Sequence, residues 1–328
     1  MASFSSDEIK GWHKWEGWVA SASLPGTCGE LVQGSLDGLP CLVSCPIDRY
    51  SRAHVRIHNH LTGWKTPVQA SKALAALNLA IKRLGWPAAG GELSLASDLP
   101  RARGYASSTA DIGAALFALS RACQVVLSPA EAARLAVAIE PTDSTLFPGL
   151  ALFNHRDGGF FEALAPAPRL DLIVIDPGGA VDTQIYHQFE PRAVLRRLAP
   201  QHRTAFSMLR DGLAKHDLQA VGEAASLSAR LHQDILFNPL LDRTFVLARR
   251  LHALGVCRAH SGTILGLLFD PLKQDSEDAL RETRCCFPPA VFISRQKMVN
   301  GGPTYHEPLD YSFPSGQVVN LAASCEER

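Results

Sequence analysis

A turn-rich segment at residues 100–110 holds the residues with the clearest chemical potential in this sequence. It reads Pro-Arg-Ala-Arg-Gly-Tyr-Ala-Ser-Ser-Thr-Ala. Alternating apolar residues predict a strand over 92–96 before it, and an alanine-rich stretch predicts a helix over 106–122 after it. The first N–H groups of a helix have no partners within the helix, and the helix dipole adds positive charge there. A strand that leads through a tight loop into a helix is therefore a natural site for a phosphate group.

The side chains of this segment suit a polyphosphate. Gly104 lets a phosphate approach the backbone, Arg101 and Arg103 add positive charge, and the hydroxyls at 107–109 include one that can bind Mg²⁺. The segment is not a Walker A loop, because the G-x-x-x-x-G-K-[ST] pattern is absent. An ordinary loop with a serine-rich helix cap has the same composition, so that alternative stays open.

Two carboxylates, Glu140 and Asp143, follow a predicted helix that begins at Ser128-Pro129 and ends near Ile139. They are close enough in sequence to share one site. Phosphoryl transfer needs metal ligands and often a base that accepts the proton of the attacking hydroxyl. A turn that caps the helix is the alternative, since Thr-Asp-Ser is a common turn composition.

The cysteines offer a second kind of chemistry. Cys28 lies in a glycine-flanked loop, where a nucleophilic thiol would need a base such as His260. A small residue near a substrate is the simpler alternative. None of the eight cysteines forms a C-x-x-C pair, and no Cys or His pair has the spacing of a zinc site. We therefore expect reduced, structural cysteines.

The elements that position these residues alternate along the chain. Residues 17–58 are rich in strand patterns, and helical spacing follows over 68–84. Further strands are expected over 170–176, 263–269 and 290–294, and helices over 192–198, 200–214, 217–230, 239–253 and 275–281. After residue 295 periodicity is weak, which predicts a poorly packed tail. Strands followed by helices and then by mixed elements favour an α+β fold.

Segment 100–109 resembles the second motif of the GHMP kinases, P-x-x-x-G-[LM]-x-S-S-[AST]. The matching positions are Pro100, Gly104, Ser107, Ser108 and Thr109. Tyr105 stands where Leu or Met is usual, and Ala102 replaces a frequent glycine. Residues 24–34 resemble the first motif, with Thr27 in place of the lysine of mevalonate-type members, and 259–266 resembles a degenerate third motif.

Three segments narrow the resemblance to the L-threonine kinases of cobalamin biosynthesis. They are C-G-E-L-[IV]-Q-G at 28–34, A-S-S-T-A-D-I at 106–112 and E-P-T-D-S-T at 140–145. The resemblance implies a GHMP fold of two closely packed lobes. The N-terminal, ATP-binding lobe over 18–165 would be like ribosomal protein S5 domain 2, and the C-terminal lobe over 166–295 would be ferredoxin-like. Residues 1–17 and 296–328 would be extensions of unknown role.

The resemblance also implies roles for individual residues. Asp143 would be the general base or would orient the acceptor hydroxyl, and Ser108 and Glu140 would bind Mg²⁺. The ATP-binding residues would be Pro100, Arg101, Ala102, Arg103, Gly104, Tyr105, Ala106, Ser107, Ser108, Thr109 and Ala110. The substrate would contact Thr27, Cys28, Glu30, Asp48, His260, Ser261 and Gly262, of which Glu30 and Asp48 are acidic candidates for an ammonium group.

The implied activity is ATP-dependent phosphorylation of the side-chain hydroxyl of free L-threonine. The product would be O-phospho-L-threonine, for the aminopropanol arm of cobalamin. Homoserine, serine or another small alcohol is the alternative within the kinases. A GHMP-fold sensor that binds ATP or a ligand without turnover is the alternative from another class.

Composition limits the partners. The 328 residues carry 32 Lys and Arg against 32 Asp and Glu, so charge favours neither a nucleic acid nor an anionic membrane. No apolar run reaches the roughly 18 residues of a membrane span. The polar residues 1–18 lack the apolar core of a secretory signal, so we expect a cytoplasmic protein. Oligomeric state is left open, and a homodimer is compatible with the sequence.

Overall fold

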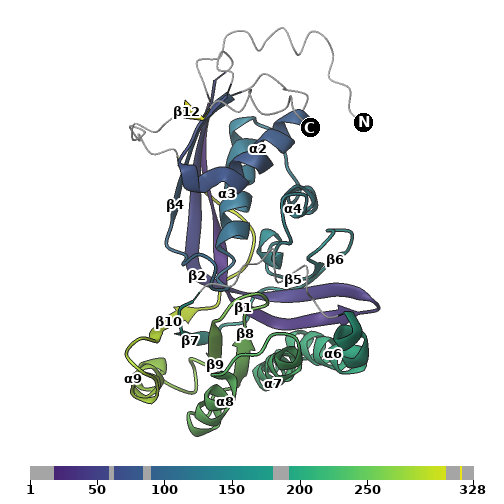
Figure 1. The fold of residues 1–328 in the computed structure, drawn as a ribbon, viewed down its shortest axis with the longest axis vertical. Coiled ribbons are helices and arrows are strands. Elements are labelled where there is room, and N and C mark those ends of the chain that lie inside the picture. Colours follow the sequence, from purple (N-terminus) through teal and green to yellow (C-terminus); the bar gives the residue numbers. More distant parts are fainter. Residues whose placement is uncertain (1–17, 59–62, 84–89, 180–191, 308–317, 320–328) are drawn as a thin grey trace.

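The computed structural model describes residues 18–58, 63–83, 90–179, 192–307 and 318–319. A long antiparallel hairpin runs through the middle of the molecule (Figure 1). Strands β1 (Trp18–Leu36) and β2 (Leu39–His58) pair from Trp18↔Ile57 to Leu36↔Leu39, with register shifts between residues 25 and 32. Asp37 and Gly38 form the two-residue turn with positive φ angles of 50° and 81°, as a type I′ hairpin requires.

One sheet runs through both halves of the molecule in the order β10-β7-β9-β8-β1-β2-β4-β3-β12, while β11 pairs with β1 and β5 pairs with β2 and β6. The remaining strands are β3 (Trp64–Lys65), β4 (Gly90–Ser97), β5 (Leu150–Asn154), β6 (Phe161–Ala165), β7 (Asp171–Asp176), β8 (Gly255–Arg258), β9 (Leu265–Phe269), β10 (Phe292–Lys297), β11 (Thr304–His306) and β12 (Val318–Val319). The two halves meet where Glu30 of β1 pairs with Arg258 of β8.

The half of the molecule at the top of Figure 1, here called the upper half, has three helices on one side of its strands. They are α2 (Ser71–Arg83), α3 (Ser107–Ala122) and α4 (Pro129–Val137). Thirteen of the sixteen residues of α3 are buried, so this helix is the centre of the larger hydrophobic core. Helix α4 begins after Ser128, as the sequence predicts, and Ser128 and Glu131 form a complete capping box there.

The lower half has α6 (Arg192–Ala214), α7 (Leu218–Leu231), α8 (Leu241–Arg250) and α9 (Ser276–Cys286). Its strands follow the order β10-β7-β9-β8 and are all antiparallel. Helices connect β7 to β8 and β9 to β10, which is the ferredoxin-like arrangement that the resemblance implies. A second hydrophobic core forms here around Ile173, Phe245 and Val256.

The α+β fold and most of the predicted elements are confirmed. The helical patterns at 192–198 and 200–214 belong to a single helix, α6, which includes Pro200. Pro200 is exposed, so the carbonyl that its missing N–H leaves without a partner one turn earlier can bind water. The end of the helical pattern expected over 68–84 lies outside the described residues.

The prediction of a poorly packed tail after residue 295 is wrong for residues 296–306. The backbone N–H of Met298 donates to Leu170 O at 2.9 Å, and that of Gly302 donates to Thr145 O at 2.7 Å. Strand β11 then pairs with β1. A Cβ at Gly301 would lie 2.5 Å from Phe147 O, so glycine allows this segment to approach the sheet.

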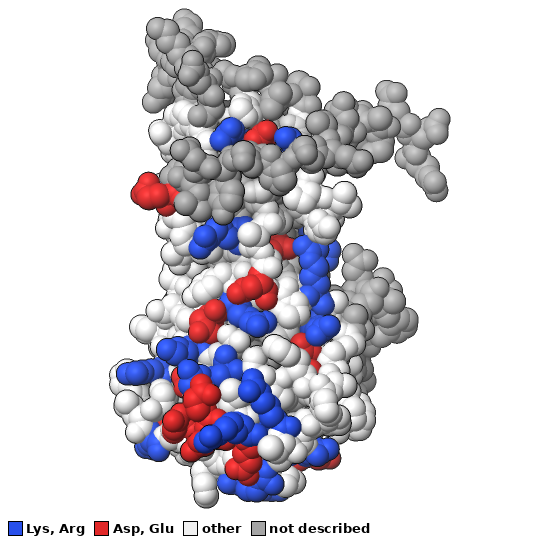
Figure 2. All heavy atoms as spheres, turned by 90° about the vertical axis from the view of Figure 1, so that its left-hand side faces the viewer, with Lys and Arg blue, Asp and Glu red and all other residues white. Residues whose placement is uncertain are grey.

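Among the described residues, no helix is both long and apolar enough for a bilayer. Five of the seven described cysteines are buried and all seven are free thiols, in line with a structural role. Acidic and basic side chains are intermixed over the lower half of the face in Figure 2, as expected for a chain with equal numbers of both.

Candidate active site

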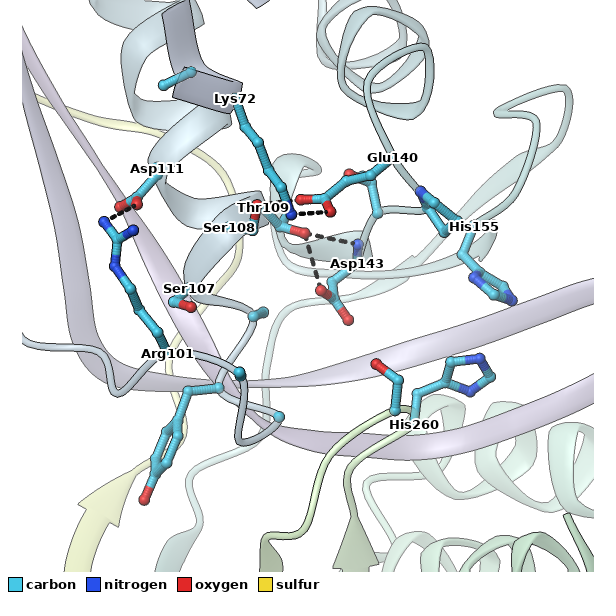
Figure 3. Close-up of a pocket in the computed structure, with 18 of the residues that line it drawn as sticks. Lys72, Arg101, Ser107, Ser108, Thr109, Asp111, Glu140, Asp143, His155 and His260 are labelled. Carbon is cyan, nitrogen blue, oxygen red and sulfur yellow. Dashed lines mark hydrogen bonds and ion pairs between the residues drawn. The ribbon is translucent and has the colours of Figure 1, made fainter. Parts of the chain in front are cut away.

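A cavity opens between the start of α3, the start of α2 and the turn at 140–143 (Figure 3). It brings together most of the side chains that the sequence singles out: Glu30, Arg101, Ala102, Gly104, Tyr105, Ala106, Ser107, Ser108, Thr109, Glu140, Asp143, His260 and Ser261 line it. Pro100, Arg103, Ala110, Thr27, Cys28, Asp48 and Gly262 do not. Segments from both halves of the molecule therefore contribute to one site.

The backbone of the 100–106 loop is shaped for an anion. Ala102, Gly104 and Ala106 all have positive φ angles, of 60°, 102° and 55°. This conformation is unfavourable for alanine, and such strain concentrates at functional sites. Alternation of left-handed residues with ordinary ones is also the geometry of a backbone nest, which gathers N–H groups around an anion.

Hydrogen bonds hold this loop from the side opposite the cavity. The N–H of Thr263 donates to Arg103 O at 2.9 Å, and the N–H of Thr27 donates to Tyr105 O at 3.0 Å. The Thr27 hydroxyl donates to Gly104 O at 3.2 Å. In a planar trans peptide the C=O and the following N–H point in opposite directions. The N–H groups of residues 104–106 therefore point away from these supports, and all three residues line the cavity.

The third motif supports the loop by close packing. A Cβ at Gly104 would lie 2.3 Å from the Ala259 Cβ, and a Cβ at Gly262 would lie 2.4 Å from the Arg103 carbonyl oxygen. Gly262 and Thr27, expected to contact substrate, thus support the 100–106 loop and do not line the cavity. Glycine suits position 262 because there is no room for a Cβ there.

The two arginines of the loop have different partners. Arg101 lines the cavity and pairs with Asp111 of α3 at 3.2 Å. Arg103 pairs instead with the buried Asp176 of β7 at 3.1 Å, and the same carboxylate oxygen accepts the Tyr105 hydroxyl at 3.3 Å. Burial and the negative charge of Asp176 raise the pKa of Tyr105, which keeps the phenol neutral. Arg103 thus connects the loop to the lower half and does not line the cavity.

Ser108 and Glu140 lie in contact, and the Ser108 hydroxyl donates to Glu140 Oε1. Lys72 of α2 binds the other oxygen, Oε2, at 2.6 Å. A serine hydroxyl beside a carboxylate is a fitting oxygen pair for Mg²⁺, which completes its shell with water and phosphate oxygens. The described residues contain no group of three His, Cys, Asp or Glu side chains that could hold a metal by themselves.

Lys72 is a site residue that sequence reasoning missed. It lies in the first turn of α2 and lines the cavity. Nothing in its position distinguishes it from a solvated lysine on an amphipathic helix.

Asp143 occupies the centre of the site (Figure 3). Its Oδ2 accepts the Thr109 hydroxyl at 2.9 Å, and its own N–H donates to Thr109 Oγ1 at 3.2 Å. Burial raises the pKa of Asp143, while hydrogen bonds from Glu30 and Thr109 lower it. A half-buried carboxylate held in this way, beside the 100–106 loop, is suited to accept a proton.

His155 and His260 form the wall on the far side of Asp143 in Figure 3. Their rings meet edge to face with centroids 4.6 Å apart. Gln33 fixes the His260 ring through a contact of 2.6 Å between its Oε1 and Nδ1. His155, which the sequence does not single out, enters the site from the end of β5.

Two expected substrate contacts lie elsewhere. Cys28 is buried, its Sγ is 3.9 Å from Cys257 Sγ, and contact with that thiol together with burial raises the pKa of Cys28. A neutral, enclosed thiol does not suit a nucleophile. Asp48 is exposed, and its Oδ1 accepts the backbone N–H of Lys297 at 2.8 Å.

Comparison with known proteins shows the family of this chain. The sequence pattern of the GHMP kinases N terminal domain matches residues 71–147. The L-threonine kinase of Citrobacter freundii is 32% identical over 260 residues, which span 78% of this chain and 88% of that protein. The L-threonine kinase of Salmonella typhimurium is 34% identical over 272 residues, spanning 78% and 85%.

Among solved structures, a homoserine kinase from Cytophaga hutchinsonii has the same fold. The TM-score is 0.68 at 16% sequence identity, with 93% of this chain and 100% of that chain covered. The fold, the matched domain and two relatives above 30% identity agree with one another. The chain therefore belongs to the GHMP kinase superfamily, and within it to the relatives of the L-threonine kinases.

Proposed function

We propose that this kinase transfers the γ-phosphate of ATP to the side-chain hydroxyl of free L-threonine, giving O-phospho-L-threonine and ADP. The observation that carries the proposal is the Thr109–Asp143 pair, which joins a half-buried carboxylate to the first turn of the helix that follows the 100–106 loop. A base and a polyphosphate site then lie within one cavity. Identity of 32% and 34% to two L-threonine kinases favours threonine as the acceptor.

In the proposed reaction the N–H groups of residues 104–106 bind the phosphates of ATP, and Arg101 adds charge. The acceptor hydroxyl lies between the γ-phosphorus and Asp143. Its oxygen forms the new P–O bond, its proton passes to Asp143, and the bond between the γ-phosphorus and the ADP oxygen breaks.

Ser108 and Glu140 are the proposed ligands of Mg²⁺, which would neutralise charge on the transferring phosphate oxygens. Lys72 is proposed to act beside them. It holds Glu140 at 2.6 Å and lines the same cavity, so its ammonium group is within reach of the phosphates.

The test is an ADP-release assay with Mg-ATP over threonine, serine, homoserine and an alcohol without an amino-acid group. The hydroxyl of homoserine lies one carbon farther from the amino-acid group than that of threonine, and one misplaced methylene costs about 1–3 kcal/mol. We therefore expect kcat/KM to be at least about tenfold higher for threonine than for homoserine. A higher kcat/KM for homoserine than for threonine would identify homoserine as the substrate. Binding of ATP without turnover of any alcohol would favour the ligand sensor.

Further parts of the proposal concern the cell. We propose that the product serves the aminopropanol arm of cobalamin synthesis, that the enzyme is cytoplasmic, and that it needs no nucleic-acid or membrane partner. Restored cobalamin synthesis in a host that lacks its own threonine kinase would test the role of the product. Cell fractionation tests the cytoplasmic location, and light scattering tests whether the protein is a homodimer.

A further inference from the structure

The floor of the cavity contains two carboxyl groups in contact, Glu30 of β1 and Asp143. Glu30 is only 2% exposed, yet it lines the cavity. A hydrogen bond connects the two side chains. Within the described part of the chain, the second carboxyl oxygen of Glu30, Oε2, has no hydrogen-bond partner. The sequence suggests that Glu30 binds a substrate ammonium group, but its position next to Asp143 indicates another role.

The backbone aims Glu30 at Asp143. The register of β1 with β2 shifts on both sides of Glu30, and Gly29 has a φ of +63°. A Cβ at Gly29 would lie 2.2 Å from the carbonyl carbon of Arg258, so only glycine fits. Bulges of this kind redirect a side chain near active sites.

A reciprocal serine pair fixes the distance between the two acids. The N–H of Ser44 donates to Ser144 Oγ at 3.0 Å, and the N–H of Ser144 donates to Ser44 Oγ at 3.0 Å. Ser144 follows Asp143, and Ser44 is the β2 partner of Glu30. Since Ser44 Oγ accepts a proton from Ser144, its own hydroxyl proton is available for its hydrogen bond to Glu30.

Two carboxylates in contact inside a protein cannot both be ionised. Asp143 receives the Thr109 hydroxyl on Oδ2, which stabilises its charge. Of the Lys and Arg side chains that line the cavity, Lys72 is bound to Glu140 and Arg101 to Asp111. Burial and the charge of Asp143 raise the pKa of Glu30 well above its usual range. Glu30 is the more deeply buried of the two acids and Asp143 keeps the Thr109 hydrogen bond, so we assign the shared proton to Glu30.

We propose that Glu30 is a positioning residue: a neutral carboxylic acid that donates its proton in a hydrogen bond to Asp143 and holds that carboxylate in line for the acceptor hydroxyl. This role rests on the proposed function of Asp143 as the base. The proton of Glu30 is not consumed. Asp143 takes the hydroxyl proton while the O–P bond forms, and Glu30 keeps its own proton throughout.

The test compares Glu30→Gln with Glu30→Ala. A glutamine amide has the size of the acid and donates an N–H where the acid donates its O–H, so kcat should stay within about fivefold of the wild type. Alanine removes the donor, and kcat should fall about 10- to 100-fold while KM for ATP changes little. Rescue by glutamine separates positioning from a general loss of structure.

Substrate comparison separates this role from ammonium binding. The acceptors are L-threonine and 3-hydroxybutyrate, which has the same hydroxyl and carboxylate without the ammonium group. We expect Glu30→Gln to leave the ratio of kcat/KM for the two acceptors unchanged within about threefold. A loss of more than about 30-fold with threonine alone would show an ionised Glu30 that binds ammonium, and would overturn the proposal. Equal losses in the Gln and Ala variants, or none in either, would overturn it too.

Infrared difference spectroscopy tests whether Glu30 carries a proton, and it needs no activity assay. At neutral pH the wild type should show the carbonyl stretch of a protonated carboxylic acid that Glu30→Gln lacks. Absence of this band would disprove the neutral acid. If the wild type phosphorylated no alcohol at all, the proposed function would fail, whereas the band would still decide the state of Glu30.

Discussion

The two ends of the cavity are built in different ways. The proposed phosphate end consists of consecutive backbone N–H groups in the 100–106 loop, which Thr27 and Thr263 support by hydrogen bonds. The proposed acceptor end consists of side chains from β1, the residue after β5, the turn at 140–143 and the segment after β8. A backbone site binds any phosphate chain of suitable shape, while a side-chain site can change its specificity one residue at a time. This difference explains how one fold can serve kinases for different alcohols.

Removal of the base at the acceptor end should have the largest effect. Asn at position 143 keeps the shape of the carboxylate but cannot accept a proton. Asp143→Asn should therefore lower kcat by about a hundredfold to ten-thousandfold, with ATP affinity within a few-fold because the 100–106 loop is intact. Steady-state kinetics and nucleotide binding measure the two effects.

If Asp143 only capped a turn, asparagine would do so nearly as well. A folded Asp143→Asn enzyme with normal kcat would then remove the base from the acceptor end.

A side chain at Gly104 should damage the phosphate end selectively. Its φ is +102° and a Cβ would lie 2.3 Å from that of Ala259, so the loop must move. Gly104→Val should weaken ATP binding by about tenfold or more, equivalent to about 1.4 kcal/mol. Isothermal calorimetry with an ATP analogue measures the change.

Gly38→Val is the matched control. Gly38 also has a positive φ, of 81°, but no atom lies within 4 Å of the position where its Cβ would be. The control should lose stability and keep its ATP affinity. Equal affinity in Gly104→Val and wild type would exclude this loop as the phosphate site.

Ser108 and Glu140, the proposed Mg²⁺ ligands, lie between the two ends. Loss of one of them should therefore lower turnover by weakening metal binding. Ser108→Ala removes one proposed ligand and leaves Glu140 with Lys72. We expect the Mg²⁺ concentration for half-maximal rate to rise about tenfold, and excess EDTA to abolish turnover in the wild type. A metal titration at saturating ATP measures both, and full activity in EDTA would refute the metal role.

The same difference between the ends governs what the sequence could predict. The phosphate loop is contiguous, so the order of Pro100, Gly104 and Ser107–Thr109 carries its geometry. Lys72, His155 and Asp176 reach the site or its support only through long-range packing, and their local sequence has no motif. The lower half was predicted less completely, because β8 has only four residues, too few for periodicity to show.

Residues 296–306 illustrate the same limit. Their glycines and polar residues are typical of a loose tail, yet a free edge of β1 and the backbone near Thr145 supply partners for them. Partners of this kind come from the tertiary structure. A pattern read along the chain therefore cannot include them.

Substitution of Thr27 has the smallest expected effect on the kinetics. It also tests most sharply whether this residue belongs to the phosphate end or to the acceptor end of the cavity. The sequence suggests that it contacts substrate, whereas its hydroxyl donates to Gly104 O at 3.2 Å behind the phosphate loop. Thr27→Val keeps the volume of the side chain and removes this bond, which is worth about 0.5–1.5 kcal/mol. KM for ATP should rise about two- to tenfold, and KM for threonine should stay the same. Thr27→Ser keeps the hydroxyl and should restore the ATP value. A rise in KM for threonine alone would move Thr27 to the acceptor end, because a support of the phosphate loop has no means of distinguishing one acceptor from another.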